Sequence, residues 1–83
     1  MDNKFEVGKT YRGTMLHGGD VHYTVVERTD RQVTMKEQWI AEDTGEEAKD
    51  FVKYDIEIES GIEKIKLWEY KGHEAWIYAN EGR

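Results

Sequence analysis

Carboxylates are the side chains most able to take part in catalysis or binding in this 83-residue chain, and ten of them lie between positions 37 and 63. They are Glu37, Glu42, Asp43, Glu46, Glu47, Asp50, Asp55, Glu57, Glu59 and Glu63. Against these ten acids the stretch holds two lysines, Lys49 and Lys53, so its net charge is −8. Paired carboxylates catalyse proton transfer when their surroundings push their pKa values apart. Because these acids are predicted to share one solvated face, they favour a binding surface over a catalytic pair.

A second set of residues could bind a metal ion. His17, Asp20 and His22 lie within six residues around a predicted turn, and imidazole and carboxylate groups are competent metal ligands. The adjacent glycines Gly18 and Gly19 explain the turn without a metal, and aspartate is an ordinary turn residue. We therefore predict no metal site and no cofactor.

Residues for nucleophilic catalysis are scarce. The chain has no cysteine. Its single serine, Ser60, precedes Gly61 in a predicted turn, and this context does not resemble a nucleophile elbow. The glycines are isolated turn markers and do not form a phosphate-binding loop. We therefore predict a protein that is not an enzyme.

Basic and aromatic residues gather around a predicted turn at 29–32. The set consists of Arg28, Arg31, Lys36 and Trp39. Single-stranded nucleic acids bind such groups, because cations contact phosphates and bases stack on aromatic rings. However, the acids Glu27, Asp30 and Glu37 interleave with these cations and nearly neutralise them. A hairpin with internal salt bridges is therefore the preferred interpretation, and nucleic-acid binding is the alternative.

Alternating apolar residues and glycine-containing turns predict an all-β fold. The expected strands span residues 9–16, 21–28, 33–40, 52–58, 63–70 and 74–79. Six short antiparallel strands in a meander favour closure into a small barrel or a strongly curled sheet, since long open edges promote aggregation. Residues 44–52 allow two interpretations: a hairpin that turns at Thr44 and Gly45, which we prefer, or a short helix with Thr44 and Glu47 as a capping box.

The strand at 52–58 has the strictest alternation. Its apolar side consists of Val52, Tyr54, Ile56 and Ile58, and its polar side of Lys53, Asp55, Glu57 and Glu59. This period of two predicts a folded, acidic sheet face. We expect Glu46, Glu47, Asp55, Glu57 and Glu59 to bind a basic protein surface. The alternative is that these charges keep the protein soluble and protect sheet edges from pairing.

The composition indicates one domain over residues 1–83. Aromatic residues make up 12% of the chain, and each large ring buries roughly 150–250 Å², which is enough to close a small core. Residues 1–36 carry a net charge of +1 and residues 37–83 carry −7. This acidity disfavours nucleic acid as a partner, because phosphate binding needs clustered lysine and arginine.

The sequence also predicts the location of the protein. No apolar run approaches the roughly 20 residues that a membrane span needs. The first residues lack a basic region followed by a hydrophobic stretch, which a signal peptide would have. We expect a cytoplasmic protein that contacts no membrane.

Three segments, taken in order, resemble the start of small uncharacterised proteins encoded by bacteriophages and mobile elements of Firmicutes. The segments are 5–11 (FEVGKTY), 23–29 (YTVVERT) and 33–35 (VTM), followed by weaker similarity at 61–63 (GIE) and 77–79 (IYA). In that group the third quarter is basic, whereas here it is acidic. The resemblance implies a small β-fold and a mobile-element origin, and it supplies no catalytic residues.

Together these patterns predict a non-enzymatic interaction module, an accessory protein of a phage or mobile element, with an acidic face for a basic partner. A sharper form of this hypothesis is an inhibitor of a host nucleic-acid-binding enzyme, such as a restriction or CRISPR nuclease, which would occupy the basic groove of that enzyme. The alternative is a small barrel that binds single-stranded nucleic acid through the hairpin at 28–39.

Overall fold

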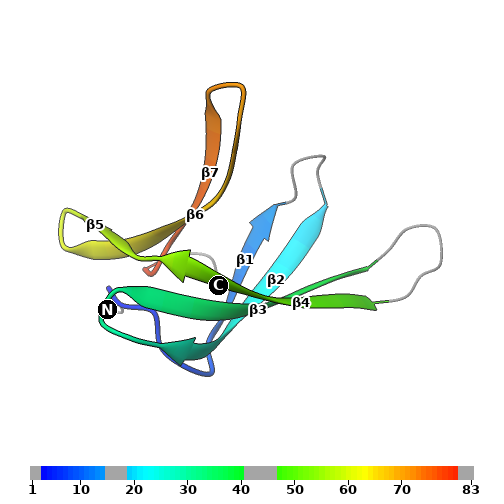
Figure 1. Ribbon diagram of the computed structural model, residues 1–83, viewed down its shortest axis with the longest axis horizontal. Helices are drawn as coiled ribbons and strands as arrows, with labels where there is room; N and C mark the ends of the chain where they lie inside the picture. The colour runs from blue at the N-terminus through cyan, green and yellow to red at the C-terminus, as the bar shows by residue number, and fades with distance from the viewer. Residues whose placement is uncertain (1–2, 15–18, 41–46, 81–83) are drawn as a thin grey trace.

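The computed structural model describes residues 3–14, 19–40 and 47–80, except for the side chains of residues 40 and 47–49. The described residues form seven β-strands (Figure 1). These are β1 (Thr10–Thr14), β2 (Asp20–Arg28), β3 (Gln32–Ile40), β4 (Glu47–Asp55), β5 (Glu57–Glu59), β6 (Ile62–Tyr70) and β7 (His73–Tyr78). None of these residues belongs to a helix that is long and apolar enough to span a membrane.

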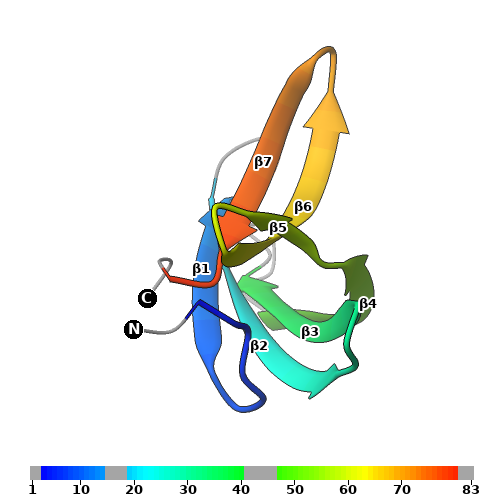
Figure 2. The ribbon, with the colours of Figure 1, turned by 90° about the vertical axis from the view of Figure 1, so that its left-hand side faces the viewer.

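The strands form two antiparallel sheets, which confirms the predicted all-β class. The first sheet has the order β1-β2-β3-β4 and the second has the order β5-β6-β7. In Figure 2 the β6–β7 hairpin rises from the four-stranded sheet, and β1 contacts β7 while β4 contacts β6. The predicted closed barrel or strongly curled sheet is wrong, because the described strands pair in two separate ladders.

The chain changes sheets at Ile56, within the segment predicted as a single strand at 52–58. β4 ends at Asp55, and β5 begins at Glu57 in the second sheet. The N–H of Ile56 donates to the carbonyl of Arg31, 2.8 Å away, which ties this corner to the turn between β2 and β3. The predicted six strands therefore become seven. Residues 47–52 belong to β4, so the alternative of a helix is wrong there, while the turn predicted at Thr44 and Gly45 lies outside the described residues.

A β-bulge interrupts each sheet. In the β2–β3 pair, Val25 faces Met35 and Glu27 faces Thr34, so Val26 is an extra residue. In the β6–β7 pair, Leu67 is extra in the same way, between Lys66 and Trp68. A bulge shifts the alternation of side chains by one position. Residues after each bulge therefore point to the face opposite to the one that the sequence pattern predicts.

The core lies between the two sheets. Its buried side chains are Phe5, Tyr11, Val21, Tyr23, Val25, Val33, Met35, Ile65, Ile77 and Ala79. Phe5 and Tyr11 pack edge to face, with ring centroids 5.1 Å apart. At Gly13 the two sheets are in close contact, because a Cβ atom there would lie 2.9 Å from Leu67 of the second sheet, as well as 2.6 Å from the Tyr23 ring of the neighbouring strand. Glycine at this position allows β1 to pack against the second sheet.

Candidate functional site

The acidic stretch at 37–63 does not form one surface, because its last member points into the protein. Glu63 on β6 is 5% exposed and is the buried charged residue of the described chain. Its carboxylate binds the Arg28 guanidinium through two hydrogen bonds, of 2.7 Å from Nη1 and 3.0 Å from Nη2. The N–H of Phe5 donates to the same carboxylate at 2.9 Å, and Arg28 donates to the Phe5 carbonyl at 2.8 Å.

Glu63 is ionised in this arrangement. Burial alone raises the pKa of Glu63, but the hydrogen bonds from Arg28 and the Phe5 N–H, together with the Arg28 charge, outweigh burial and lower it. The hydrogen bond to Glu63 raises the pKa of Arg28. The pair joins β2, β6 and the segment before β1. It is a structural ion pair, with no group free to act on a substrate.

The bulge at Val26 explains why Arg28 points inward. Without the bulge, the alternation of Val21, Tyr23 and Val25 would continue to Glu27 and leave Arg28 in solvent. With the bulge, Arg28 pairs with Val33, a fully buried residue, and shares its inner face. The sequence pattern carries no mark of this shift, since nothing in the residues 25–28 requires a bulge.

The four residues of the alternative nucleic-acid surface therefore separate. Arg28 is in the ion pair, and Trp39 packs against the core from the inner face. Lys36 is half-buried on the outer face of β3, opposite Phe51. Arg31 is exposed in the turn between β2 and β3. These positions do not bring the four side chains onto one surface, as the alternative of a single-stranded nucleic-acid platform requires.

The predicted acidic face divides between two edge strands. Asp55 ends β4, the edge of the first sheet, while Glu57 and Glu59 lie on β5, the edge of the second. Glu47 begins β4, and Glu46 lies outside the described residues. The predicted inward position of Ile58 is wrong, because this side chain is 70% exposed. Ile58 is therefore exposed on β5 between Glu57 and Glu59 in the sequence, and we call Asp55, Glu57, Ile58 and Glu59 the acidic edge.

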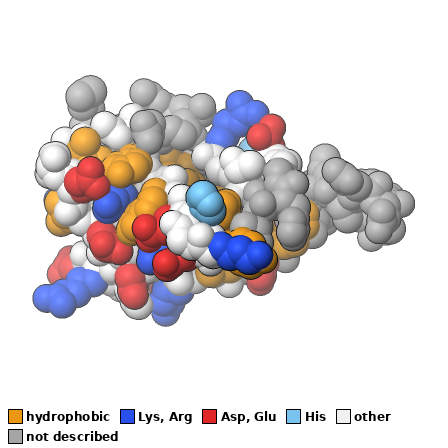
Figure 3. Space-filling model, turned by 90° about the horizontal axis from the view of Figure 1, so that it is seen from above, with side chains coloured by type: hydrophobic (Ala, Val, Ile, Leu, Met, Phe, Trp, Pro, Cys, Tyr) orange, Lys and Arg blue, Asp and Glu red, His pale blue; other side chains and the backbone are white. Residues whose placement is uncertain are grey.

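The acids of this edge differ in the groups that they contact. Lys64 binds Glu59 at 2.6 Å, and the hydrogen bond from Lys64 lowers the pKa of Glu59. Asp55 accepts a hydrogen bond from the Gln32 amide at 2.9 Å. On the face drawn in Figure 3, lysine and arginine side chains lie beside acids and hydrophobic side chains.

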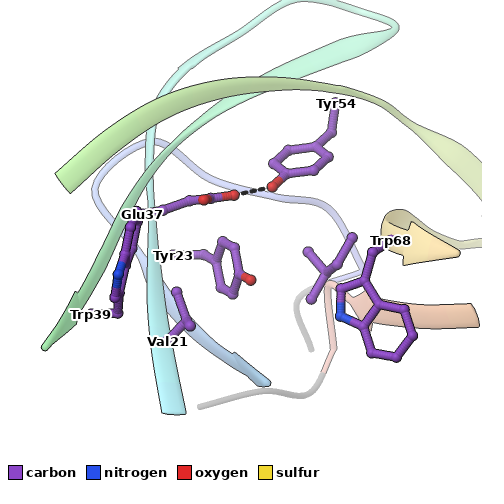
Figure 4. A pocket seen from close by; sticks show the side chains of 7 residues that line it. Val21, Tyr23, Glu37, Trp39, Tyr54 and Trp68 are labelled. Carbon is purple, nitrogen blue, oxygen red and sulfur yellow. Dashed lines mark hydrogen bonds between the residues drawn. The ribbon is translucent and has the colours of Figure 1, made fainter. Parts of the chain in front are cut away.

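An aromatic pocket of about 190 Å³ opens between the sheets at the other end of the core. Its lining consists of Val21, Tyr23, Glu37, Trp39, Tyr54, Leu67 and Trp68. Figure 4 shows Trp39 and Trp68 on opposite sides of the pocket, with Tyr23 between them. Leu67 and Trp68 are consecutive, yet both line the pocket, because the bulge in β6 breaks their alternation.

Glu37 supplies the charge of this aromatic pocket. It occupies an inward position of β3, between Met35 and Trp39, and the Tyr54 hydroxyl donates a hydrogen bond to its carboxylate. Burial and the Glu37 charge raise the pKa of Tyr23 to about 12. Burial, followed by the hydrogen bond and charge of Glu37, also raises the pKa of Tyr54. Both hydroxyls are therefore neutral donors beside a carboxylate.

The sequence pattern indicates that these aromatic residues belong to the core and does not predict the pocket. One signal could have revealed it: Glu37 shares the period-two positions of Val33, Met35 and Trp39, so it had to face inward. A charged residue on the inner face of a small β-domain is unusual unless it is paired. Glu63 has such a partner within the described chain, whereas for Glu37 the partner in the described residues is a neutral hydroxyl.

The remaining sequence candidates do not add a site. Among the described residues, no group of three His, Asp or Glu side chains is arranged to hold a metal ion. Asp20 and His22 are exposed on β2, and Asp20 pairs with Arg12 at 3.6 Å, while His17 lies outside the described residues. Comparison with known protein families, curated proteins and solved structures finds no match.

Proposed function

We propose that this protein is a non-enzymatic interaction module that binds a basic protein partner through the acidic edge. The observation that supports this proposal is the exposure of Ile58 on a strand of only three residues, between Glu57 and Glu59. An exposed aliphatic side chain at a sheet edge promotes association. The carboxylates of the acidic edge repel acidic surfaces and attract basic ones, which steers the choice of partner.

The position of these residues suits a partner that approaches from outside. β4 and β5 are both edge strands, so one side of each is open to an added strand or a flat surface. Asp55 and Glu57 flank the corner at Ile56 where the chain changes sheets. Lys64 binds Glu59 and lies opposite Glu57 in the β5–β6 pair, so it offsets part of the charge of both glutamates, and Asp55 adds the third carboxylate.

The biological role that we propose is that of an accessory protein of a phage or mobile element. An acidic edge on a small folded domain could compete with the nucleic-acid backbone for the basic groove of a host enzyme, such as a restriction or CRISPR nuclease. Acids at alternate positions of a strand are about 6.8 Å apart, which is close to the spacing of phosphates along an extended strand. The nucleic-acid-binding alternative receives less support, because Arg28 is engaged by Glu63.

The test compares two variants with the same change in net charge. One reverses the acidic edge (Asp55→Lys with Glu57→Lys), and the matched control reverses exposed acids elsewhere (Asp20→Lys with Glu74→Lys). Each immobilised protein is exposed to a lysate of the bacterial host, and the captured proteins are identified and tested for nucleic-acid binding. We expect the wild type and the control to capture the same basic protein, and the edge variant to lose it by about tenfold or more.

Two results would contradict the proposal. Equal capture by the edge variant and the wild type would show that the acidic edge does not bind the partner. Equal loss of capture in both variants would show that binding depends only on the net charge of the protein. Because all the substituted acids are exposed, thermal unfolding should show that both variants remain folded.

A further inference from the structure

The aromatic pocket has the chemistry of a cation site. Its walls are aromatic rings from Tyr23, Trp39, Tyr54 and Trp68, and its charge is the carboxylate of Glu37. The face of an aromatic ring attracts cations, most strongly when the site is partly shielded from water. A carboxylate beside such rings adds direct attraction and excludes anions.

The negative charge at this pocket has no ion-pair partner among the side chains that the structure describes. In residues 3–14, 19–39 and 50–80, no lysine or arginine forms an ion pair with Glu37. Asp50, directly opposite Glu37 on β4, adds a second carboxylate and raises the pKa of Tyr54 through its charge. Two acids therefore lie beside four aromatic rings at one end of the sheet.

The pocket volume limits the size of a ligand. Sites for drug-sized molecules span about 300–1,000 Å³, whereas this pocket measures about 190 Å³. It accommodates a single head group or the end of one side chain. The polar groups that face such a ligand are a carboxylate and phenolic hydroxyls, which suit a nitrogen cation and not a phosphate.

We propose that this pocket binds an alkylammonium cation, with Glu37 as the counter-ion and Trp39 and Trp68 as the flanking rings. The ligand chemistry is that of a lysine side chain, with or without methyl groups, or of a free quaternary amine. The bound cation neutralises the Glu37 carboxylate, and its methylene groups cover apolar ring surface. Both parts of the ligand therefore contribute to the free energy of binding.

This inference goes beyond the proposed function, because the two surfaces are separate. Glu37 lies opposite Asp50, which is five residues, or about 17 Å, along β4 from Asp55. Tyr54 of the pocket adjoins Asp55, but successive side chains of a strand point to opposite faces: Tyr54 packs against the core and Asp55 is exposed. One surface can therefore fail its test while the other passes.

The first experiment uses the wild-type protein and the indole N–H signals of its tryptophans. The probes are two matched pairs: N-acetyl-lysine methylamide against its neutral norleucine analogue, and choline against its carbon isostere 3,3-dimethyl-1-butanol. We expect the cations, at millimolar concentration, to shift the signals of Trp39 and Trp68. Trp76 is the internal reference, because its ring already contacts Lys64, with the ammonium 4.2 Å from the ring centroid.

The outcome also identifies the source of the cation. A stronger response to the lysine derivative supports a side chain of a protein, and a stronger response to choline supports a free quaternary amine. Equal shifts with the cations and their neutral analogues would overturn the proposal in favour of a purely apolar pocket. The absence of any shift at Trp39 and Trp68 would also overturn it.

A substitution then tests the counter-ion. Glu37→Gln keeps an oxygen that can accept the hydrogen bond from Tyr54 but removes the charge. We expect it to weaken binding of the cations about tenfold or more, since hydrogen bonds and contacts to a charged group are worth more than neutral ones. The matched control is Glu27→Gln, which removes one exposed charge from β2 and should bind as the wild type does. Equal affinity of the Glu37→Gln variant would overturn the assignment.

Discussion

Arg28 and Glu63 lie 35 residues apart in the sequence and meet at 2.7 Å between the two sheets. Their contact joins β2 to β6, and the hydrogen bonds of both residues to Phe5 fix the segment before β1. The Trp68 indole N–H also crosses between the sheets, to the Thr14 carbonyl at 3.1 Å, so the ion pair is one of the polar contacts that hold the sheets together. The sequence predicts that Arg28 pairs with acids of its own hairpin, whereas its partner in the structure is the buried Glu63.

The first prediction concerns the stability that this pair supplies. Glu63→Ala leaves the Arg28 guanidinium on the inner face without its partner, and breaking a buried pair costs about 3–5 kcal/mol. The free energy of unfolding of such a domain is about 5–15 kcal/mol, so a large part of it should be lost. Urea unfolding followed by tryptophan fluorescence measures the change.

A double substitution separates the ion pair from the packing of its neighbours. Arg28→Met with Glu63→Leu replaces both charges with apolar groups of similar volume, which is often neutral or stabilising. We expect it to recover most of the stability lost in Glu63→Ala. As a surface control, Lys66→Gln removes exposed pairs with Glu69 and Glu74 and should leave the unfolding midpoint close to that of the wild type. A Glu63→Ala variant as stable as Lys66→Gln would contradict the buried role of Glu63.

The second prediction concerns Gly13, where β1 meets the second sheet. A methyl group in Gly13→Ala would lie 2.6 Å from the Tyr23 ring and 2.9 Å from Leu67. Inserting a methylene-sized group into a packed core costs about 1–3 kcal/mol, and we expect a loss of that size in the free energy of unfolding. Because Leu67 and Tyr23 also line the aromatic pocket, the signal of Trp68 should move as well. Adding Leu67→Val should cost less in the Gly13→Ala background than in the wild type, whereas purely additive costs would show that the methyl group does not contact Leu67.

Much of the fold can be predicted from local sequence pattern, and the errors of that prediction have physical causes. The predicted strands at 21–28, 33–40, 63–70 and 74–79 agree with β2, β3, β6 and β7 to within two residues at either end, because alternation and turn residues are local signals. The division of the 52–58 strand between sheets is not local. It depends on the bond from Ile56 to the Arg31 carbonyl, which joins residues that are distant in the sequence. The predicted barrel failed for the same reason, since pairing between sheets is a long-range property.

The candidate sites were less predictable, because one-residue shifts decide which way side chains point. The bulge at Val26 takes Arg28 out of solvent, and the bulge at Leu67 brings Trp68 into the pocket. A period-two pattern assumes an unbroken register, so every residue after a bulge is assigned to the wrong face. Glu37, by contrast, lies on β3, which pairs with β4 in an unbroken register. Its inward position could therefore be predicted from the sequence.

The third prediction tests the environment of Tyr23 beside Glu37. Burial first, and then the Glu37 charge, raises the pKa of this hydroxyl from 10.0 to about 12. In the unfolded chain Tyr23 ionises near pH 10, so its contribution to stability is fully present below that pH. The contribution is lost as pH rises from 10 to about 12, because the unfolded state releases its proton first.

The Cζ chemical shift of Tyr23, followed by NMR during an alkaline titration, reports the ionisation directly. In Glu37→Gln the pKa should fall but stay above 10.0, since burial is the larger cause. A midpoint near 10 in the wild-type protein would contradict the burial of Tyr23. An unchanged midpoint in Glu37→Gln would show that the Glu37 carboxylate does not act on the Tyr23 hydroxyl.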